Sequence, residues 1–458
     1  MIADLKPFPA YKESGLPWLG SMPAHWSRER AKWLFTKMER PVDDGDGVVT
    51  CFRDGMVTLR KNRRLRGFTE AIYEHGYQGI RRGDLVIHAM DAFAGAVGVS
   101  DSDGKATPVY AVCQPKPGIN AHYYAFIVRE MARSQWILAL SRGIRERSTD
   151  FRYDTFGGQR VPLPPLAEQV AIVRFLDWAN GRLERAIRAK RKVIALLNEQ
   201  KHAIIHRAVT RGLDPSVPLK PSGIPWLGDI PQHWDTALNQ RIFKEDIRAH
   251  NGSIETQLSL SQRDGLIATK DMQERSLQTA SYDNWKVAVP GDLVLNRFKA
   301  HLGVFFAATL RGIVSFHYGV FAPLRKLHTK YFELLFHTYP YRAIYAGCSN
   351  GMTVGLQNLS NQNFYNVRSV VPPISEQVAI VEYTERETQV LNTAISRLER
   401  EIELLREYRN RLVADVVTGK LDVREAAAQL PEEATPDIAE EDTDPLTDPE
   451  SADEEAVE

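Results

Sequence analysis

The sequence of 458 residues has few cysteines and no long apolar run. Its three cysteines, Cys51, Cys113 and Cys348, lie far apart and form no CxxC pair, which excludes a disulfide scaffold and a zinc site built on cysteine. We therefore expect a protein of the reducing cytoplasm. No stretch of ~18 apolar residues is present, so we expect no membrane span. The first residues also lack the apolar core of a secretory signal.

Motifs for catalysis and for cofactors are missing as well. The sequence contains no GxxxxGK[ST] phosphate loop, no GxGxxG after a strand and no Asn-Pro-Pro-aromatic segment of the amino-methyltransferase type. His202 and His206 are one helical turn apart, but they lack the Glu of an HExxH zinc motif and an evident third ligand. We therefore predict no catalytic residue, no metal site and no cofactor in this chain.

The formal net charge of zero is the sum of a positively charged region and a negatively charged one. Residues 431–458 hold thirteen of the 58 acidic side chains and none of the 58 basic ones. Residues 1–430 therefore carry a surplus of thirteen positive charges, which favours a polyanionic partner. The acidic tail has almost no large apolar side chains to bury, so we expect it to be disordered.

The chain is a tandem duplication at a constant offset of 208 residues. The segment Ser14-Gly-Leu-Pro-Trp-Leu-Gly-Ser-Met-Pro-Ala-His-Trp26 returns as 222–234 with nine of thirteen positions identical. The same offset relates Gly83-Asp-Leu-Val86 to residues 291–294, and Glu168-Gln-Val-Ala-Ile-Val173 to residues 376–381. One offset across several separate blocks indicates two copies of a single unit, followed by the tail.

The first part of each copy is predicted to be a mixed α+β domain. Aromatic and β-branched runs such as 85–88 and 111–113 are broken by Gly, Asp and Pro, which is typical of strands and turns. Helices are expected over 122–140 and 329–345. We assign the following segments: 1–26, an N-terminal leading segment; 27–163, the first domain; 164–221, the first long helix and second leading segment; 222–371, the second domain; 372–429, the second long helix; and 430–458, the tail.

The second part of each copy is predicted to be a long helix that begins after a Pro-Pro pair, a favourable place for a helix start. Apolar residues step by four and three along both helices, with one basic residue at the same place, Lys201 and Arg409. A seam of this period over nearly four heptads predicts a coiled coil, and the two helices are each other's most obvious partners. The expected pairing residues are Leu183, Ile187, Ile194, Leu197, Ile204, Leu391, Ile395, Leu398, Ile402, Leu405 and Leu412.

Two clusters of cations in the first domain are candidates for contacts with nucleic acid. Long cations beside short hydroxyl side chains suit phosphate, and guanidinium groups can also recognise guanine edges. A solvated basic surface is the alternative explanation for each cluster alone. The candidate residues are Arg60, Lys61, Arg63, Arg64 and Arg66 in one cluster, and Arg142, Arg145, Arg147 and Arg152 in the other.

The second domain has different candidates at its polar segments. They are Asn296, Arg297, Lys299, His301, Asn350 and Thr353, although an Asn-Gly pair such as 350–351 is more often a simple turn. The two copies agree in their framework blocks and diverge in these segments, and 60–66 corresponds to the dissimilar 268–274. Two equal halves would bind a palindromic DNA site, whereas two halves that differ in their contact residues would bind two different half-sites.

Together these blocks resemble the specificity subunit of type I restriction–modification systems, over nearly the whole chain up to about residue 425. The resemblance rests on the duplicated Trp-containing segments, on Gly-Asp-Leu-Val, and on the Pro-Pro…Glu-Gln starts of both long helices. A further family pattern, Ser/Thr-Pro-x-Tyr, is present as 107–110. At 315–318 the Pro is replaced by Phe316, which leaves the shape of that loop open.

The resemblance implies a non-catalytic subunit that binds double-stranded DNA. Two target-recognition domains would each recognise half of an interrupted, asymmetric site, while antiparallel helices set their spacing and dock two methyltransferase subunits. S-adenosylmethionine, ATP and magnesium would belong to those methyltransferase subunits and to motor–nuclease subunits. We expect Trp18, Trp26, Trp226 and Trp234 to pack the leading segments onto helix ends. Two alternatives are a nuclease or methyltransferase in this chain, and a coiled-coil scaffold whose basic surface is incidental.

Overall fold

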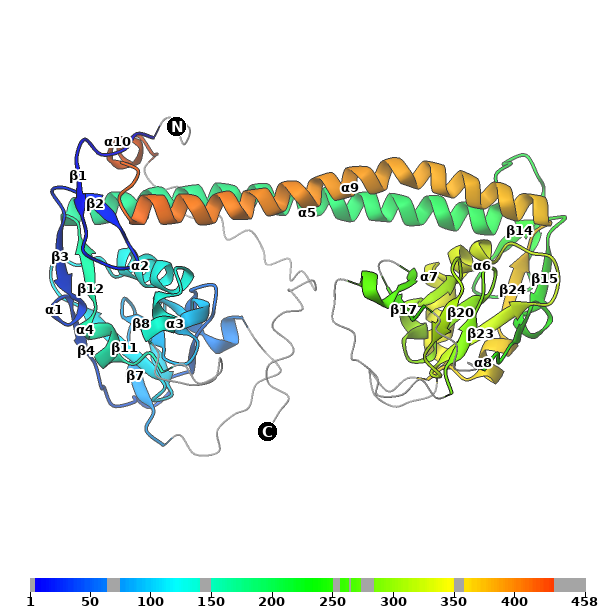
Figure 1. The fold of residues 1–458 in the computed structure, drawn as a ribbon, viewed down its shortest axis with the longest axis horizontal. Coiled ribbons are helices and arrows are strands. Elements are labelled where there is room, and N and C mark those ends of the chain that lie inside the picture. Colours follow the sequence, from blue (N-terminus) through cyan, green and yellow to red (C-terminus); the bar gives the residue numbers. More distant parts are fainter. Residues whose placement is uncertain are drawn as a thin grey trace. The chain divides into compact units, whose positions relative to one another are not determined.

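The structure is a computed structural model, and it describes residues 5–63, 75–140, 150–249, 256–262, 265–272, 284–349 and 358–431. It divides into two compact units, one formed by residues 1–188 with 402–458 and the other by residues 189–401. Each unit therefore combines the globular part of one copy, the start of that copy's long helix and the end of the other copy's long helix (Figure 1). The acidic tail, expected to be disordered, lies outside the described residues beyond Pro431.

The first unit is built around a four-stranded antiparallel sheet with the order β4-β11-β8-β9, accompanied by four two-stranded sheets. The small sheets pair β1 with β2, β3 with β12, β5 with β6 and β7 with β10. The strands are β1 Tyr11–Glu13, β2 Ser21–Pro23, β3 Ser27–Arg30, β4 Phe35–Lys37, β5 Val49–Cys51, β6 Val57–Leu59, β7 Gln78–Ile80, β8 Leu85–His88, β9 Val97–Val99, β10 Gly104–Ala106, β11 Tyr110–Pro115 and β12 Arg160–Leu163.

The second unit repeats this arrangement sheet for sheet. Its four-stranded sheet has the order β16-β23-β20-β21, and its small sheets pair β13 with β14, β15 with β24, β17 with β18 and β19 with β22. The strands are β13 Leu219–Pro221, β14 Asp229–Pro231, β15 Asp235–Leu238, β16 Phe243–Glu245, β17 Leu258–Ser261, β18 Gly265–Ala268, β19 Lys286–Ala288, β20 Leu293–Asn296, β21 Phe305–Ala307, β22 Gly312–Val314, β23 Tyr318–Pro323 and β24 Arg368–Val371. The duplication expected from the sequence is thus a duplication of the fold.

The helices follow the same repeat. The first unit contains α1 Ala31–Leu34, η2 Arg60–Asn62, η3 Ala92–Ala94, α2 Ala121–Arg133, α3 Trp136–Leu140, α4 Tyr153–Gly158 and α10 Arg424–Ala428. The second contains η4 Asn239–Arg241, η5 Thr269–Asp271, η6 Arg297–Leu302, α6 Thr329–Phe336, α7 Tyr339–Cys348 and α8 Asn361–Asn366. The long helices α5 Leu166–Arg211 and α9 Ile374–Val417 begin directly after the Pro-Pro pairs, as predicted.

Two helices expected as single stretches are each divided in two. The segment 122–140 forms α2 and α3, which are separated at Gln135, where φ is +60°. The segment 329–345 forms α6 and α7, and the second of these starts at a Pro in its first turn. Pro340 has no backbone N–H to donate to the preceding turn, so a new helix begins there instead of the old one continuing.

The repeated tryptophans fix the leading segments to the starts of the long helices. Trp26 is fully buried, and its indole N–H donates to Glu168 at 2.8 Å, while Nε2 of His25 lies 2.8 Å from the same carboxylate. Trp234 donates to Glu376 at 2.9 Å in the second unit. The packing role expected for Trp26 and Trp234 is confirmed, and Trp18 and Trp226 are partly buried against the two main cores.

The repeated Gln next to each of these glutamates holds a second connection. In α5 the Gln169 side chain donates to the Pro164 carbonyl at 2.9 Å and accepts from the backbone N–H of Asn120, just before α2. Gln377 makes the same two bonds in the second unit, to Pro372 and His328, both at 2.8 Å. The Glu-Gln dipeptide recurs because its two side chains join each long helix to two different segments of the adjacent domain.

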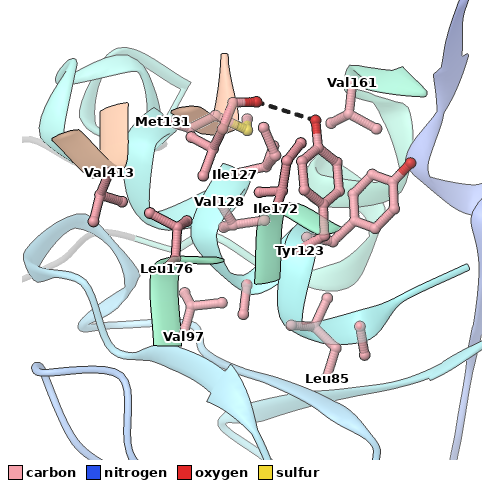
Figure 2. Close-up of a cluster of buried hydrophobic side chains, with 14 of the residues drawn as sticks. Leu85, Val97, Tyr123, Ile127, Val128, Met131, Val161, Ile172, Leu176 and Val413 are labelled. Carbon is pink, nitrogen blue, oxygen red and sulfur yellow. Dashed lines mark hydrogen bonds between the residues drawn. The ribbon is translucent and has the colours of Figure 1, made fainter. Parts of the chain in front are cut away.

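The core of the first unit lies between its main sheet, α2 and the two long helices. Figure 2 shows Leu85 and Val97 from the sheet, Tyr123, Ile127, Val128 and Met131 from α2, Ile172 and Leu176 from α5, and Val413 from α9. The second unit has an equivalent core with a higher share of aromatic side chains, among them Phe243, Phe305, Phe321, Phe332 and Phe364. Burial of this apolar surface is the main favourable contribution to folding of each unit.

The long helices pack against each other in both units, and they are antiparallel, as predicted (Figure 1). In the second unit Lys190 on α5 pairs with Glu401 at 2.6 Å, and Lys201 bonds Asn392 on α9 at 2.8 Å, so that residue numbers rise on one helix as they fall on the other. In the first unit Arg409 contacts Glu184 at 3.3 Å. No described helix is long and apolar enough to cross a membrane.

A buried ion pair supports the Gly-Asp-Leu-Val turn of each copy. Asp84 receives two hydrogen bonds from Arg40, and Asp292 receives two from Arg248, at 2.5 and 3.2 Å. Both carboxylates are almost fully buried, with side-chain exposures of 4% and 2%. Each also accepts the backbone N–H three residues before it, so the Asp fixes the turn as well as the pair.

Candidate nucleic-acid interface

Four of the candidate residues of the second domain lie at one end of its main sheet. Strand β20 ends at Asn296, which pairs with Tyr318 at the start of β23. Because these strands are antiparallel, the short helix η6 that follows β20 and the turn that precedes β23 leave the sheet at the same end. Asn296, Arg297, Lys299 and His301 belong to β20 and η6. We refer to residues 296–299 and 315–317 as the second-domain tip.

Arg297 is engaged in an ion-pair network within the domain. Its guanidinium group donates to Glu245 on β16 at 2.7 Å, and Lys286 donates to the same carboxylate at 2.9 Å. Asn361 of α8 is a third donor to Glu245. Burial acts to raise the pKa of Glu245, but the bond and charge of Lys286, the charge of Arg297 and the bond from Asn361 outweigh it and lower that pKa.

The network leaves one net positive charge beneath the tip. Arg297 and Lys286 carry two positive charges, Glu245 carries one negative charge, and Lys286 also donates to the Tyr318 carbonyl at 2.9 Å. The Arg297 side chain is 22% exposed, and its buried Nε has no hydrogen-bond partner. The bond to Glu245 thus holds one edge of the guanidinium group and fixes its orientation.

The other candidates on β20 and η6 differ in exposure. Lys299 is exposed to solvent, whereas the Nδ1 atom of His301 is buried and has no hydrogen-bond partner. The Asn296 side chain accepts a hydrogen bond from the Phe298 backbone at 3.1 Å, so its oxygen caps η6. Lys299 is therefore the more accessible of the two cations of the tip, while Asn296 retains its amide group as a donor.

The tip turn keeps its shape without the proline of the family pattern. In the first domain the Tyr110 backbone N–H donates to the Thr107 carbonyl at 3.2 Å. In the second domain Tyr318 donates to the Ser315 carbonyl at 2.9 Å. The same four-residue turn thus forms in both copies, and the change from Pro108 to Phe316 alters the side chain presented there and not the backbone bond that closes the turn.

The described candidates of the first cationic cluster lie on and beside η2, directly after β6. Lys61 is exposed, and the Arg60 Nε atom donates to the Thr50 hydroxyl at 3.2 Å. Arg63 pairs with Asp54 at 2.7 Å, and its guanidinium lies 4.4 Å from the ring centroid of Phe52. Each of these two arginines is thus oriented by contacts within the domain, and neither is fully buried.

The second cationic cluster is represented by one residue. Arg152 pairs with Asp150 at 2.7 Å, and 77% of its side chain is exposed. The remaining candidates, Arg64, Arg66, Arg142, Arg145, Arg147, Asn350 and Thr353, lie outside the described residues. Among the described residues no three His, Cys, Asp or Glu side chains are grouped so as to hold a metal ion.

Among the described residues of the first domain, the network below the second-domain tip has no counterpart. Glu245, Lys286, Arg297 and Asn361 correspond, at the offset of 208, to Lys37, Gln78, Ala89 and Tyr153. One hydrogen bond is kept by a different side chain: Gln78 donates to the Tyr110 carbonyl, as Lys286 donates to the Tyr318 carbonyl. The scaffold is shared, but the polar groups that it presents at this end are not.

The helix-pairing residues predicted from the seam are either buried or half-buried. Ile187 is 2% exposed, Leu412 4%, Ile402 7%, Leu183 8% and Ile395 9%. The half-buried ones are Ile194, Leu197, Ile204, Leu391, Leu398 and Leu405. Apolar residues elsewhere on these helices remain in solvent, such as Val193, Leu196, Val390 and Leu404.

Comparison with known proteins depends on the fold, since the sequence matches no protein-family model and no curated protein. One matching chain comes from a structure describing complex assembly and conformational transition of the type I R-M system. It has a TM-score of 0.57 and 15% identity, over 87% of this chain and 99% of that chain. The chain has the fold of a type I S subunit.

Two further S-subunit structures match over similar lengths at lower scores. The HsdS subunit from Thermoanaerobacter tengcongensis is 16% identical with a TM-score of 0.43, over 87% of this chain and 98% of that one. The type I restriction-modification S subunit from M. genitalium is 11% identical with a TM-score of 0.34, over 86% and 96%. The S-subunit fold predicted from the duplicated motifs is confirmed by the match with a TM-score of 0.57 and by the antiparallel helices.

Several residues at the second-domain tip and in the network beside it were not singled out from the sequence. Glu245 accepts a hydrogen bond from Arg297 and is also bound by Lys286 and Asn361, and the exposed rings of Phe298 and Phe316 belong to the same tip. The offset of 208 could have indicated them, because each replaces a residue of different chemistry in the other copy. Such substitutions within a shared framework mark the positions where two duplicated domains have diverged in what they present.

Proposed function

We propose that this chain is the sequence-specific DNA-recognition subunit of a type I restriction–modification complex. Each globular domain recognises one half of a bipartite, asymmetric site in double-stranded DNA. The paired helices set the spacing between the halves and dock two methyltransferase subunits, to which motor–nuclease subunits add. The chain itself is not an enzyme, and S-adenosylmethionine, ATP and magnesium are bound by its partners in the cytoplasm.

One observation carries this proposal most strongly. The two units repeat the same sheets and the same helix contacts, yet the residues at the tips differ in charge and size. A duplicated scaffold with unequal contact surfaces suits two different half-sites, whereas equal surfaces would suit a palindrome. The basic surplus of residues 1–430 suits the phosphate backbone, which supplies much of the affinity for DNA.

The decisive experiment is to co-express the chain with a methyltransferase subunit from the same genome and to map methylated adenines across the DNA of the host. We expect methylation at one split, non-palindromic motif, and none in cells that express the methyltransferase subunit alone. A palindromic motif would contradict two unequal half-sites. Methylation that does not depend on this chain would contradict its role in recognition and favour a scaffold.

A second measurement separates recognition from catalysis. The purified chain, incubated with S-adenosylmethionine and DNA, is expected to transfer no methyl group, and the same chain with its partner subunits is expected to do so. Methyl transfer by the chain alone would place an active site in it and overturn the proposed division of labour.

A further inference from the structure

Three aromatic rings form a continuous exposed row at the second-domain tip. The His317 ring lies between the other two, 3.8 Å from the Phe316 centroid and 5.5 Å from that of Phe298. Phe298 is 40% exposed and Phe316 48%, and His317 is also exposed. Single apolar side chains on a surface are common, but a contiguous aromatic cluster on an otherwise polar tip indicates a contact site.

The backbone holds these rings in a defined position. Phe298 is the second residue after β20, and its backbone N–H donates to the Asn296 side chain at 3.1 Å. Phe316 and His317 occupy the centre of the turn that Tyr318 closes on Ser315. Both segments leave adjacent strands at the paired residues Asn296 and Tyr318, so the rings are fixed to the main sheet from two sides. A cluster ordered before binding loses little conformational entropy when it makes its contact.

The charges around the rings favour DNA as the partner. The tip contains Arg297 and the exposed Lys299, and it contains no Asp or Glu. The carboxylate of Glu245 next to the tip already accepts hydrogen bonds from Lys286, Arg297 and Asn361. A partner that meets this surface must present both negative charge and apolar groups. The major groove of DNA does so, since phosphates border the C5-methyl groups of thymine, which Phe side chains contact.

We propose that Phe298, Phe316 and His317 form an apolar contact with thymine methyl groups in the half-site of the second domain. This inference rests on the proposed function and adds the chemical group that the tip recognises. The first domain presents a different surface at the same place: Met90, Pro108 and Val109 occupy the equivalent positions, and Met90 is 47% exposed. The two domains thus share an exposed apolar residue two positions after the end of the strand, but its size differs, and the turn carries Pro108 and Val109 in the first domain where the second has two aromatic rings.

The test uses the complex of this chain with its methyltransferase subunits and the split motif that methylation mapping defines. Replacing each thymine of the second half-site by uracil removes one methyl group and leaves the protein unchanged. We expect at least one such replacement to weaken binding about fourfold, the effect of burying one methyl-sized group. Phe298→Ala and Phe316→Ala should weaken binding to the intact motif about tenfold, leave binding to unrelated DNA unchanged and abolish the sensitivity to uracil.

Matched controls separate this contact from other effects. Tyr339→Ala removes an aromatic ring that is 83% exposed on α7, outside the tip, and should change neither affinity nor uracil sensitivity. The inference is overturned if no thymine methyl of the second half-site matters, if the Phe variants weaken all DNA equally, or if they weaken binding of the methyltransferase subunits instead. If the complex that contains the natural chain methylates no split motif, the proposed function itself fails and this inference fails with it.

Discussion

The Tyr123 hydroxyl group donates a hydrogen bond of 3.1 Å to the Val417 backbone carbonyl, 294 residues further along the chain. The second unit repeats this bond from Tyr331 to the Val209 carbonyl, at 2.8 Å. In each unit a tyrosine from the domain of one copy therefore satisfies a carbonyl at the end of the long helix of the other copy. The last carbonyls of a helix have no partner within it, so these bonds replace ones that the helix cannot make.

Removal of either hydroxyl group should destabilise its unit. Both tyrosines and their partners, Val417 and Val209, are fully buried. Tyr123→Phe or Tyr331→Phe therefore leaves a helix-end carbonyl without a partner and without access to water. We expect each variant to lose about 1–2 kcal/mol in the free energy of unfolding, measured by urea denaturation. Tyr339→Phe, which alters an 83% exposed ring, is the control and should be neutral. Equal stability of all three variants would show that these bonds contribute nothing.

The buried ion pairs beneath the Gly-Asp-Leu-Val turns lead to a second prediction. Asp292→Asn keeps the size of the side chain but removes the charge that Arg248 faces, and Asp84→Asn does the same for Arg40. Because each Arg is partly exposed, we expect a loss of roughly 2–3 kcal/mol, less than for a fully buried pair. Asp246→Asn is the matched control, since that more exposed carboxylate also pairs with Arg248. Thermal unfolding should separate the two, and a control as damaging as Asp292→Asn would contradict the prediction.

Acid should destabilise the second unit through His337. Burial lowers the pKa of this imidazole to about 4, and the nearby charges of Lys330 and Arg342 act in the same direction. A folded-state pKa below the unfolded value of 6.5 means that the unfolded chain takes up the proton first. The stability that depends on neutral His337 is therefore complete above pH 6.5 and is lost as the pH falls towards 4.

The expected loss between pH 7 and pH 5 is roughly 2 kcal/mol, from the difference in proton uptake between the two states. The His337→Gln variant retains a side-chain N–H that can donate to the Phe305 carbonyl, the present partner of Nε2 at 2.8 Å, but it cannot be protonated in this range. Urea midpoints at the two pH values should therefore differ less for this variant than for the natural chain. An identical pH dependence in both proteins would exclude His337 as the group responsible.

The sequence predicted those features of the fold that are periodic or duplicated. The step of four and three residues located the helix seam, and the offset of 208 paired Trp26 with Trp234 and Asp84 with Asp292 before any contact was known. It also predicted that the polar segments of the copies would differ. These signals are local or repeated, so they are visible without knowledge of the three-dimensional arrangement.

Contacts that join distant segments could not be predicted in this way. The partners of Glu245 come from β19, η6 and α8, up to 116 residues away, and no spacing along the chain relates them. The division of the expected helix 122–140 depends on one residue, Gln135, with an uncommon positive φ. The exposed Phe298 and Phe316 look like core residues in the sequence, and only the arrangement of β20 and β23 places them on a tip.

The helix seam gives the last prediction, because α9 carries a buried and an exposed residue of similar size close together. Ile402 is 7% exposed and Leu404, two residues later, is 49% exposed. An Asp at position 402 would bury a charge without a partner, so we expect Ile402→Asp to lose about 4 kcal/mol or more, whereas Leu404→Asp should stay within about 0.5 kcal/mol. Under the proposed function, Ile402→Asp should also prevent assembly with the methyltransferase subunits, which gel filtration of the co-expressed proteins would report. If both variants retained native stability and assembled normally, the helix pairing would not be the element on which the complex is built.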